Sequence, residues 1–288
     1  MNLRTDLALE QREISAAEDM EGIECEEVKK GEAKITRIEI TNENGEKKLN
    51  RRKGKYITVE MPNLSRFADF TESAKTIADE LKTLLPEEGL ILVAGLGNDQ
   101  ITPDALGPGC ASLIFSTRHI GKELQKSIGF EQLRPVARVI PGVLGQNGIE
   151  TVEILEGIIR RVSPAALITI DALASRRLSR LGCTVQICNT GISPGSGVGN
   201  ARAEISLDTV GIPVISIGVP TVVDALTLAC DLVGEDATER MEKNGEKMMV
   251  TPREIDLLIE HASKLVAAAI NSALQPHMDI DELMALVS

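Results

Sequence analysis

Aromatic residues are scarce in this chain of 288 residues, which has four Phe, one Tyr and no Trp. Its core must therefore be built from Leu, Ile, Val and Ala. Such side chains favour layers of buried strands and alanine-rich helices over a β-sandwich or a barrel. A chain of this length can bury one sizeable core or two small ones.

Basic residues are also fewer than acidic ones: the chain has 31 Lys and Arg against 43 Asp and Glu, so its net charge is −12. Phosphate binding needs Lys and Arg gathered on one face, so direct binding to nucleic acid is not expected. The one basic run, "KKLNRRKGK" at residues 47–55, is interpreted as part of a solvated hairpin.

The five cysteines are an odd number and include no CxxC pair, which predicts free thiols in a reducing compartment. The first fifteen residues carry acids and no apolar segment, so no signal peptide is expected. No apolar run approaches the ~18–20 residues of a membrane span. We therefore expect a soluble cytoplasmic protein with no membrane partner.

Strand and helix patterns alternate along most of the chain. Residues 1 to about 30 predict helix at best, and residues 33–62 predict a β-hairpin around the Asn-Gly signal in "NENGEK". Residues 106–124 predict one helix that contains His119. The later strands are short apolar runs suited to burial on both faces: "LILVAGLG", "VARVI", "ALITID", "TVQIC" and "VISIGVPT". The expected fold class is α/β, a doubly wound, mostly parallel sheet with helices on both faces and an N-terminal β-hairpin elaboration.

Three of these strands end in unusual loops. "LILVAGLG" leads to Asn98 and Asp104, "ALITID" is expected to stop at Asp171, and "TVQIC" runs into "NTGISPGSGVGN". In open α/β sheets, ligands bind outside the carboxyl ends of the strands. The sequence therefore predicts a site that joins Asp104 and Asp171, with a supporting oxyanion or substrate loop from Gly97, Asn98, Thr102, Ser193 and Gly195.

Each acid also has a simpler interpretation. Asp104 could cap a helix that starts near Leu106, and Asp171 could cap a helix over "ALASRRLSRL". "GLGN" matches only part of a dinucleotide fingerprint, because Gln100 stands where the third glycine belongs. It is the combination of two acids at two strand ends that indicates chemistry.

Two neighbouring carboxylates cannot both ionise cheaply, so one keeps its proton and the other remains a base. Such a pair suits amide hydrolysis, in which one carboxylate activates water and the other protonates the departing group. Other nucleophiles are poorly supported. None of the three histidines follows a strand, and Pro194 after Ser193 does not fit the GxSxG elbow.

Longer motifs in this order resemble the germination protease family of spore-forming bacteria. They are "LRTDLALE" near the N-terminus, then "GLGNDQITPDALGP", "TIDALASR", "NTGISPGSGVGNAR" and "IPVISIGVPTVVDA". The resemblance covers nearly the whole chain. It implies the fold of hydrogenase-maturation peptidases and an atypical aspartic endopeptidase whose two aspartates match Asp104 and Asp171.

The resemblance further implies a homotetramer in the forespore or spore core that degrades small acid-soluble spore proteins during germination, with no cofactor and no metal. It implies a self-processing zymogen. Here the matching cleaved bond is Asp6–Leu7, which gives a candidate propeptide of residues 1–6 and a single peptidase domain of residues 7–288. So short a segment could silence the enzyme with Leu3 as an apolar plug, or with Arg4 paired to Asp104 or Asp171 until acidification releases it.

Two alternatives remain open. A nickel-dependent maturation peptidase on the same fold would need a further ligand, usually His, near a strand end. A non-catalytic nucleotide-binding module would use "GLGN" and "GSGVGN".

Overall fold

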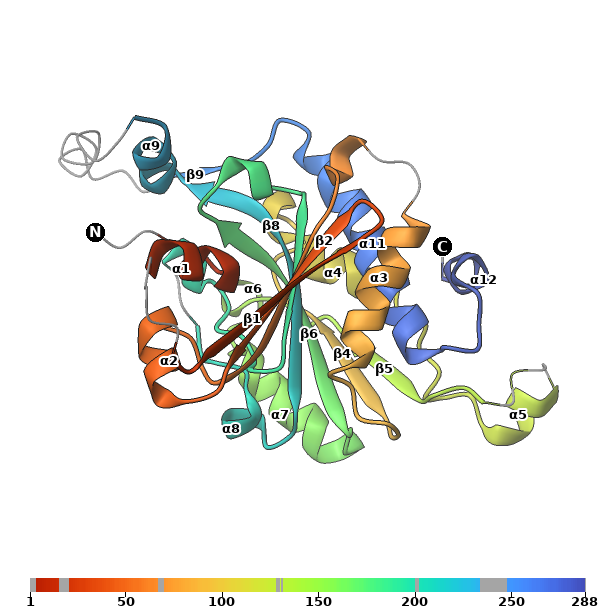
Figure 1. Ribbon diagram of the computed structural model, residues 1–288. Coiled ribbons are helices and arrows are strands. Elements are labelled where there is room, and N and C mark those ends of the chain that lie inside the picture. Colours follow the sequence, from red (N-terminus) through yellow and green to blue (C-terminus); the bar gives the residue numbers. More distant parts are fainter. Residues whose placement is uncertain are drawn as a thin grey trace.

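A nine-stranded sheet runs through the molecule and carries helices on both faces (Figure 1). The computed structural model describes residues 4–15, 21–66, 70–127, 130, 132–199, 202–233 and 248–287. The strand order is β1-β2-β3-β7-β8-β6-β4-β5, with β9 beside β8. The strands are β1 Ile23–Lys30, β2 Ala33–Ile40, β3 Gly54–Glu60, β4 Ile91–Gly95, β5 Val136–Val139, β6 Ala166–Ser175, β7 Thr184–Cys188, β8 Val214–Asp224 and β9 Met249–Val250.

The α/β class predicted from the sequence is confirmed, but the sheet is mixed rather than mostly parallel. Strands β5, β4, β6 and β8 form a parallel centre. Strand β7 joins β8 antiparallel, and β3, β2 and β1 extend that edge as an antiparallel meander. Strands β1 and β2 are joined by a tight turn, whereas β3 and β7 are far apart in the sequence and pair only in the folded chain.

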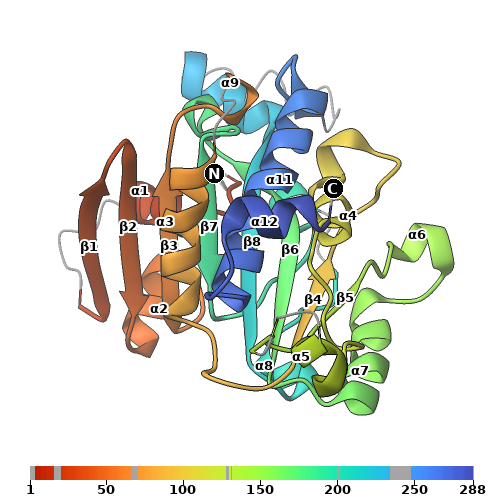
Figure 2. The same cartoon turned by 90° about the vertical axis from the view of Figure 1, so that its right-hand side faces the viewer.

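Three layers result, as seen in Figures 1 and 2. Helices α3, α4 and α11 cover one face, and α1, α2, α7 and α8 lie on the other. The described helices are α1 Ala8–Ser15, α2 Glu43–Leu49, α3 Thr71–Lys82, α4 Leu106–Ser112, α5 Lys122–Ser127, α6 Leu144–Asn147, α7 Thr151–Val162, α8 Leu207–Val210, α9 Ala225–Val233, α11 Ile255–Leu274 and α12 Ile280–Ala285.

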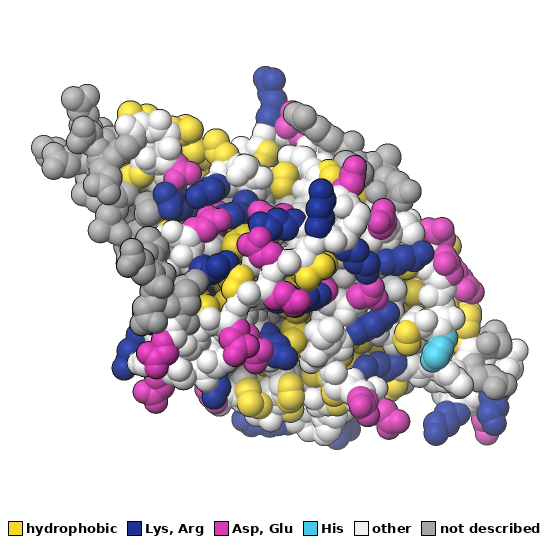
Figure 3. Space-filling view, viewed as in Figure 1, with side chains coloured by type: hydrophobic (Ala, Val, Ile, Leu, Met, Phe, Trp, Pro, Cys, Tyr) yellow, Lys and Arg dark blue, Asp and Glu magenta, His cyan; other side chains and the backbone are white. Residues whose placement is uncertain are grey.

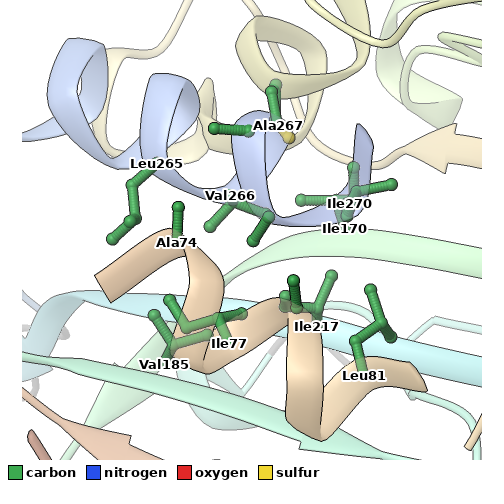
Figure 4. Close-up of a cluster of buried hydrophobic side chains, with 14 of the residues drawn as sticks. Ala74, Ile77, Leu81, Ile170, Val185, Ile217, Leu265, Val266, Ala267 and Ile270 are labelled. Carbon is green, nitrogen blue, oxygen red and sulfur yellow. The ribbon is translucent and has the colours of Figure 1, made fainter. Parts of the chain in front are cut away.

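The main core lies under α3 and α11, where aliphatic side chains interlock with those of the central strands (Figure 4). Val266 and Ile270 of α11 and Ile77 of α3 are fully buried there against Ile170 and Ile217. Helix α11 is the one described helix with the length and apolar composition of a membrane span, and 72% of its most apolar window is buried inside the protein. Its hydrophobicity is therefore explained by core packing.

The opposite face has two separate apolar clusters. One joins α7 and α8 to Leu92 and Leu167, and the other joins α1 and α2 to Tyr56 and Cys188. Between them, β6, β7 and β8 present polar side chains. They include the hydroxyls of Thr169 and Ser216, which share a hydrogen bond of 2.8 Å. This interruption of the apolar layer leaves room for a polar cavity.

Several local expectations were wrong. Residues 23–30 form β1, because pairing along β2 provides a tertiary partner that local helix propensity cannot anticipate. The Asn-Gly signal lies in α2, where the Asn42 side chain accepts a hydrogen bond from the Gly45 N–H and caps the helix. The helix predicted over residues 106–124 is split into α4 and α5, and His119 lies in the turn between them.

The outer surface mixes charges of both signs over the face shown in Figure 3. No disulfide joins the five cysteines, all of which lie in the described ranges.

A buried ion pair ties α1 to the end of β6. Glu10 is fully buried, and its carboxylate accepts hydrogen bonds from the backbone N–H groups of Arg176 and Arg177. The Arg180 guanidinium lies 3.1 Å from Glu10 and 2.6 Å from the more exposed Glu13. The carboxylate thus fixes the N-terminal helix to the β6–β7 connection.

We expect Glu10→Ala to lower the free energy of unfolding by about 3–5 kcal/mol, because it leaves a buried guanidinium short of a partner. Glu13→Ala is the matched control and should cost no more than about 1 kcal/mol, since that carboxylate is partly solvated. Urea unfolding followed by circular dichroism measures both, and equal losses would contradict the assignment.

Candidate active site

A cavity of about 540 Å³ lies where β6, β7 and β8 present polar side chains between the two apolar clusters. Its walls come from the N-terminal segment, from the Gly/Ser loop after β7, and from strands of the sheet. Asp171, Ser193 and Gly195 are among the predicted site residues that line it. Asp6 and Gln186 line it as well.

A glycine forms the floor of this cavity. Gly218 of β8 pairs with Asp171 of β6 on one side and with Gln186 of β7 on the other. A Cβ atom at Gly218 would lie only 2.6 Å from the Asp171 carbonyl oxygen, so a side chain does not fit. The space over Gly218 is filled by the Leu173 side chain, whose Cγ would lie 2.7 Å from such a Cβ atom.

Asp171 lies within β6, not at its end as the sequence suggested. Strand β6 continues to Ser175 because β8 continues beside it, with a bulge after Leu173. The helix-cap interpretation of Asp171 is thereby excluded. The pKa of its carboxyl is raised well above the usual range by burial, then by the charges of Asp104 and Asp6, while the Ala172 N–H opposes the rise.

Asp104 is held by the loop that follows β4. Gly97, with φ of +109°, lets the chain turn so tightly that a Cβ there would lie 2.1 Å from the Asp104 carbonyl oxygen. The Asn98 N–H then donates to Asp104 Oδ2 at 2.8 Å. Burial raises the pKa of the Asp104 carboxyl, and the hydrogen bond from Asn98 partly offsets that rise.

Asp104 is not a helix cap either, because Ala105 occupies the N-cap of α4 without a side-chain bond. Thr102 starts the 3-10 turn that ends at Asp104, and its carbonyl accepts the Ala105 N–H. The structure thus divides the predicted site. Gly97, Asn98 and Thr102 shape the turn around Asp104, and Ser193 and Gly195 line the cavity beside Asp171.

Asp6 adds a third buried carboxylate that was predicted only as a cleavage position. Its Oδ2 accepts a hydrogen bond of 2.8 Å from the Ala174 N–H, and its Oδ1 accepts one of 3.0 Å from Ser196 Oγ. Its own N–H donates to the Ala174 carbonyl at 2.9 Å. Burial raises the pKa of the Asp6 carboxyl against the opposing effect of these donors.

The glycines of "GSGVG" make room for the N-terminal segment. A Cβ at Gly197 would lie 2.0 Å from Asp6 Oδ2, and one at Gly199 would lie 2.7 Å from Arg4 Nη1. Gly197 and Gly199 are two residues apart, as are Asp6 and Arg4. The loop therefore lacks a side chain at the two positions where Asp6 and Arg4 pack against it.

Arg4 does not pair with either predicted catalytic acid. Its guanidinium lies 3.7 Å from Asp224 Oδ2 at the end of β8. The expected silencing of Asp104 or Asp171 by Arg4, and its release by acid, is therefore wrong. Leu3, the other predicted plug, lies outside the described residues.

Sequence reasoning missed Gln186, Ser196 and Gly197 as contacts of the N-terminal segment. The matching spacing of two in "RTD" and "GVG" was the only available signal, and it cannot be recognised before the fold brings the segments together.

The two alternative site chemistries find limited support. Within the described ranges, no group of three or more His, Cys, Asp or Glu side chains is arranged to hold a metal ion. His261 contacts the Leu64 carbonyl and the Phe70 ring, at the face covered by α11. The "GSGVG" glycines face Asp6 and Arg4, which accounts for them without a nucleotide.

Comparison with known proteins agrees with the resemblance seen in the sequence. The family model described as germination protease matches residues 4–235. A germination protease of Caldanaerobacter subterraneus subsp. tengcongensis is 43% identical, with 100% of this chain and 98% of that protein covered. The germination protease of Clostridium tetani is 42% identical, with 98% of this chain and 98% of that protein covered. The germination protease of Priestia megaterium is 34% identical, with 98% of this chain and 95% of that protein covered.

Among solved structures, a nickel–iron hydrogenase maturation protease from Thermococcus kodakarensis aligns with a TM-score of 0.38 and 16% identity. The alignment covers 66% of this chain and 98% of that one, and a likeness this weak supports no conclusion. The full-length sequence matches and the family model are decisive: the chain belongs to the germination protease family.

Proposed function

We propose that this chain is an endopeptidase that degrades small acid-soluble spore proteins during germination, by water attack assisted by Asp104 and Asp171. The observation that carries the proposal is the coupling of these acids. The Asp104 charge raises the pKa of Asp171 on the wall of a cavity that is also lined by Arg4, Thr5 and Asp6.

The surroundings of the two acids favour different roles. Asp171 is almost fully buried and faces two other carboxylates, so it is the group that keeps a proton near neutrality. Asp104 receives the Asn98 N–H, which stabilises its ionised form. Asp104 is therefore the proposed base and Asp171 the proposed acid.

In the proposed step, the water oxygen bonds to the carbonyl carbon while its proton passes to Asp104 and the π electrons move onto the carbonyl oxygen. The C–N bond then breaks as the π bond re-forms, and the departing nitrogen takes the proton of Asp171. Exchange with solvent returns both carboxyls to their starting states. No cofactor takes part.

We also propose that residues 1–6 are a propeptide removed by the enzyme itself at Asp6–Leu7, leaving residues 7–288 as the peptidase domain. Arg4, Thr5 and Asp6 line the cavity beside Asp171, so this segment lies where a substrate would. The pocket around the Asp6 carboxylate also suits a substrate with an acidic residue before the cleaved bond.

The proposed setting is the cytoplasm of the forespore and the spore core, where the enzyme would act as a homotetramer. The competing function is a nickel-dependent peptidase, which the same acids could serve if further ligands came from elsewhere in the chain.

Asp104→Asn and Asp171→Asn should each retain the fold and lower turnover of a purified small acid-soluble spore protein by at least ~10²-fold, the usual effect of losing a general acid or base. Asp99→Asn is the matched control, because this exposed neighbour in the same loop should leave turnover unchanged. Mass spectrometry of the products over time gives the rates.

Unchanged turnover in either buried variant would remove that acid from the mechanism. A chelator should leave wild-type activity intact, and strong inhibition reversed by nickel would favour the metal-dependent function.

The protonation of Asp171 can be tested without any substrate. A raised folded-state pKa means that the folded protein binds this proton more tightly than the unfolded chain, so ionising Asp171 lowers stability as the pH rises. Asp171→Asn should therefore be more stable than wild type at pH above the raised pKa. The gain should disappear as the pH falls towards ~4, the usual carboxyl pKa. Thermal unfolding of both proteins across this pH range measures the stability difference. A gain in the stability of Asp171→Asn that grows on acidification would contradict a raised pKa for Asp171.

Incubation of the purified chain should produce a new N-terminus at Leu7, and Asp104→Asn should stay whole because the proposed base is missing. N-terminal sequencing over time follows the reaction. A wild-type chain that remains whole while digesting substrate would refute the zymogen and leave the peptidase proposal standing.

A further inference from the structure

Gln186 holds the two peptide groups on either side of Leu7. Its Nε2 donates a hydrogen bond of 2.9 Å to the carbonyl oxygen of Asp6, and its Oε1 accepts one of 2.7 Å from the Ala8 N–H. The side chain is buried, with only 7% of the residue exposed. The amide is therefore fixed at both ends and withdrawn from water.

These two bonds set the orientation of the amide. A backbone N–H can only donate and a backbone carbonyl can only accept, so the oxygen of Gln186 must face Ala8 and its nitrogen must face Asp6. The N–H donor is thus aimed at one defined carbonyl oxygen before any reaction occurs. A donor placed beforehand costs no reorganisation when charge develops.

Gln186 and Asp171 flank the same glycine. Both pair with Gly218, Gln186 from β7 and Asp171 from β6, and both line the cavity. Asp6, whose carbonyl oxygen Gln186 contacts, lines that cavity too. The amide donor, the peptide carbonyl and the proposed proton donor therefore belong to one cavity wall.

The donors expected from the sequence are less suitable. The Asn98 N–H is already bonded to Asp104, and the Asn98 side-chain oxygen accepts from Gln100 and Gln146. Asn98 therefore positions an acid and does not face the peptide.

We propose that Gln186 is a catalytic residue that stabilises the oxyanion formed at the cleaved peptide bond. The inference rests on the proposed peptidase function and on cleavage after the residue in the Asp6 position. As water attacks, negative charge gathers on the oxygen that Gln186 already contacts, and the hydrogen bond strengthens.

The test uses the full chain and a synthetic peptide with the sequence of residues 2–11, made with either an oxygen or a sulfur atom in the carbonyl of its Asp6. Gln186→Met removes the donor, and Gln186→Glu replaces it with a carboxylate of the same shape. Each variant should lower kcat for the oxygen peptide about a hundredfold, the usual effect of losing one oxyanion donor, with little change in KM. Gln132→Glu is the matched control for added charge, because Gln132 is exposed and does not line this cavity.

The sulfur peptide separates catalysis from anchoring, since sulfur accepts hydrogen bonds more weakly than oxygen. Sulfur should slow the wild-type chain at least tenfold more than it slows Gln186→Met, because the variant has no donor left to lose. Equal effects of sulfur on both chains, or full kcat in both Gln186 variants, would overturn the role of Gln186 while leaving the peptidase intact. Failure of the wild-type chain to cleave the oxygen peptide, after an incubation that allows self-cleavage at Asp6–Leu7, would overturn the proposed function and this role together.

Discussion

The burial of the Asp171 carboxyl in the middle of a sheet face is the constraint on which the rest of the site depends. A carboxylate in such a place is costly to ionise, and Asp104 and Asp6 make it more so. The cost is tolerated because the group can stay protonated. In the proposed mechanism, the proton that this burial favours on Asp171 is the one passed to the departing amine.

The sheet creates this environment by its extension. The parallel strands β6 and β8 stay paired as far as Ser175, and the antiparallel β7 places Gln186 on the other side of β8. The apolar layer on that face is split into two clusters, so the intervening strands can present Thr169, Gln186 and Ser216 without burying them against hydrocarbon. Asp104 reaches the same region from the β4 loop because Gly97 allows a sharp turn.

The N-terminal segment is part of this architecture. Arg51 holds the Thr5 carbonyl at 2.9 Å, Gln186 holds Asp6, and Glu10 fixes the following helix to the end of β6. The residues on both sides of Asp6–Leu7 are therefore immobilised by independent anchors. For the proposed self-cleavage, holding this peptide bond in one geometry would supply a large part of what catalysis requires.

The sequence by itself determined the α/β class and the buried strands, because apolar runs and glycine-rich loops depend on local composition. "LILVAGLG" and "ALITID" mark strands that the structure contains, and Asp104 and Asp171 interact as their positions suggested. Tertiary structure decided where β6 stops, which partner Arg4 takes and which side chain meets the Asp6 carbonyl. Those outcomes depend on the register of β6, β7 and β8 around Gly218, and register is fixed by pairing between residues that are distant in the sequence.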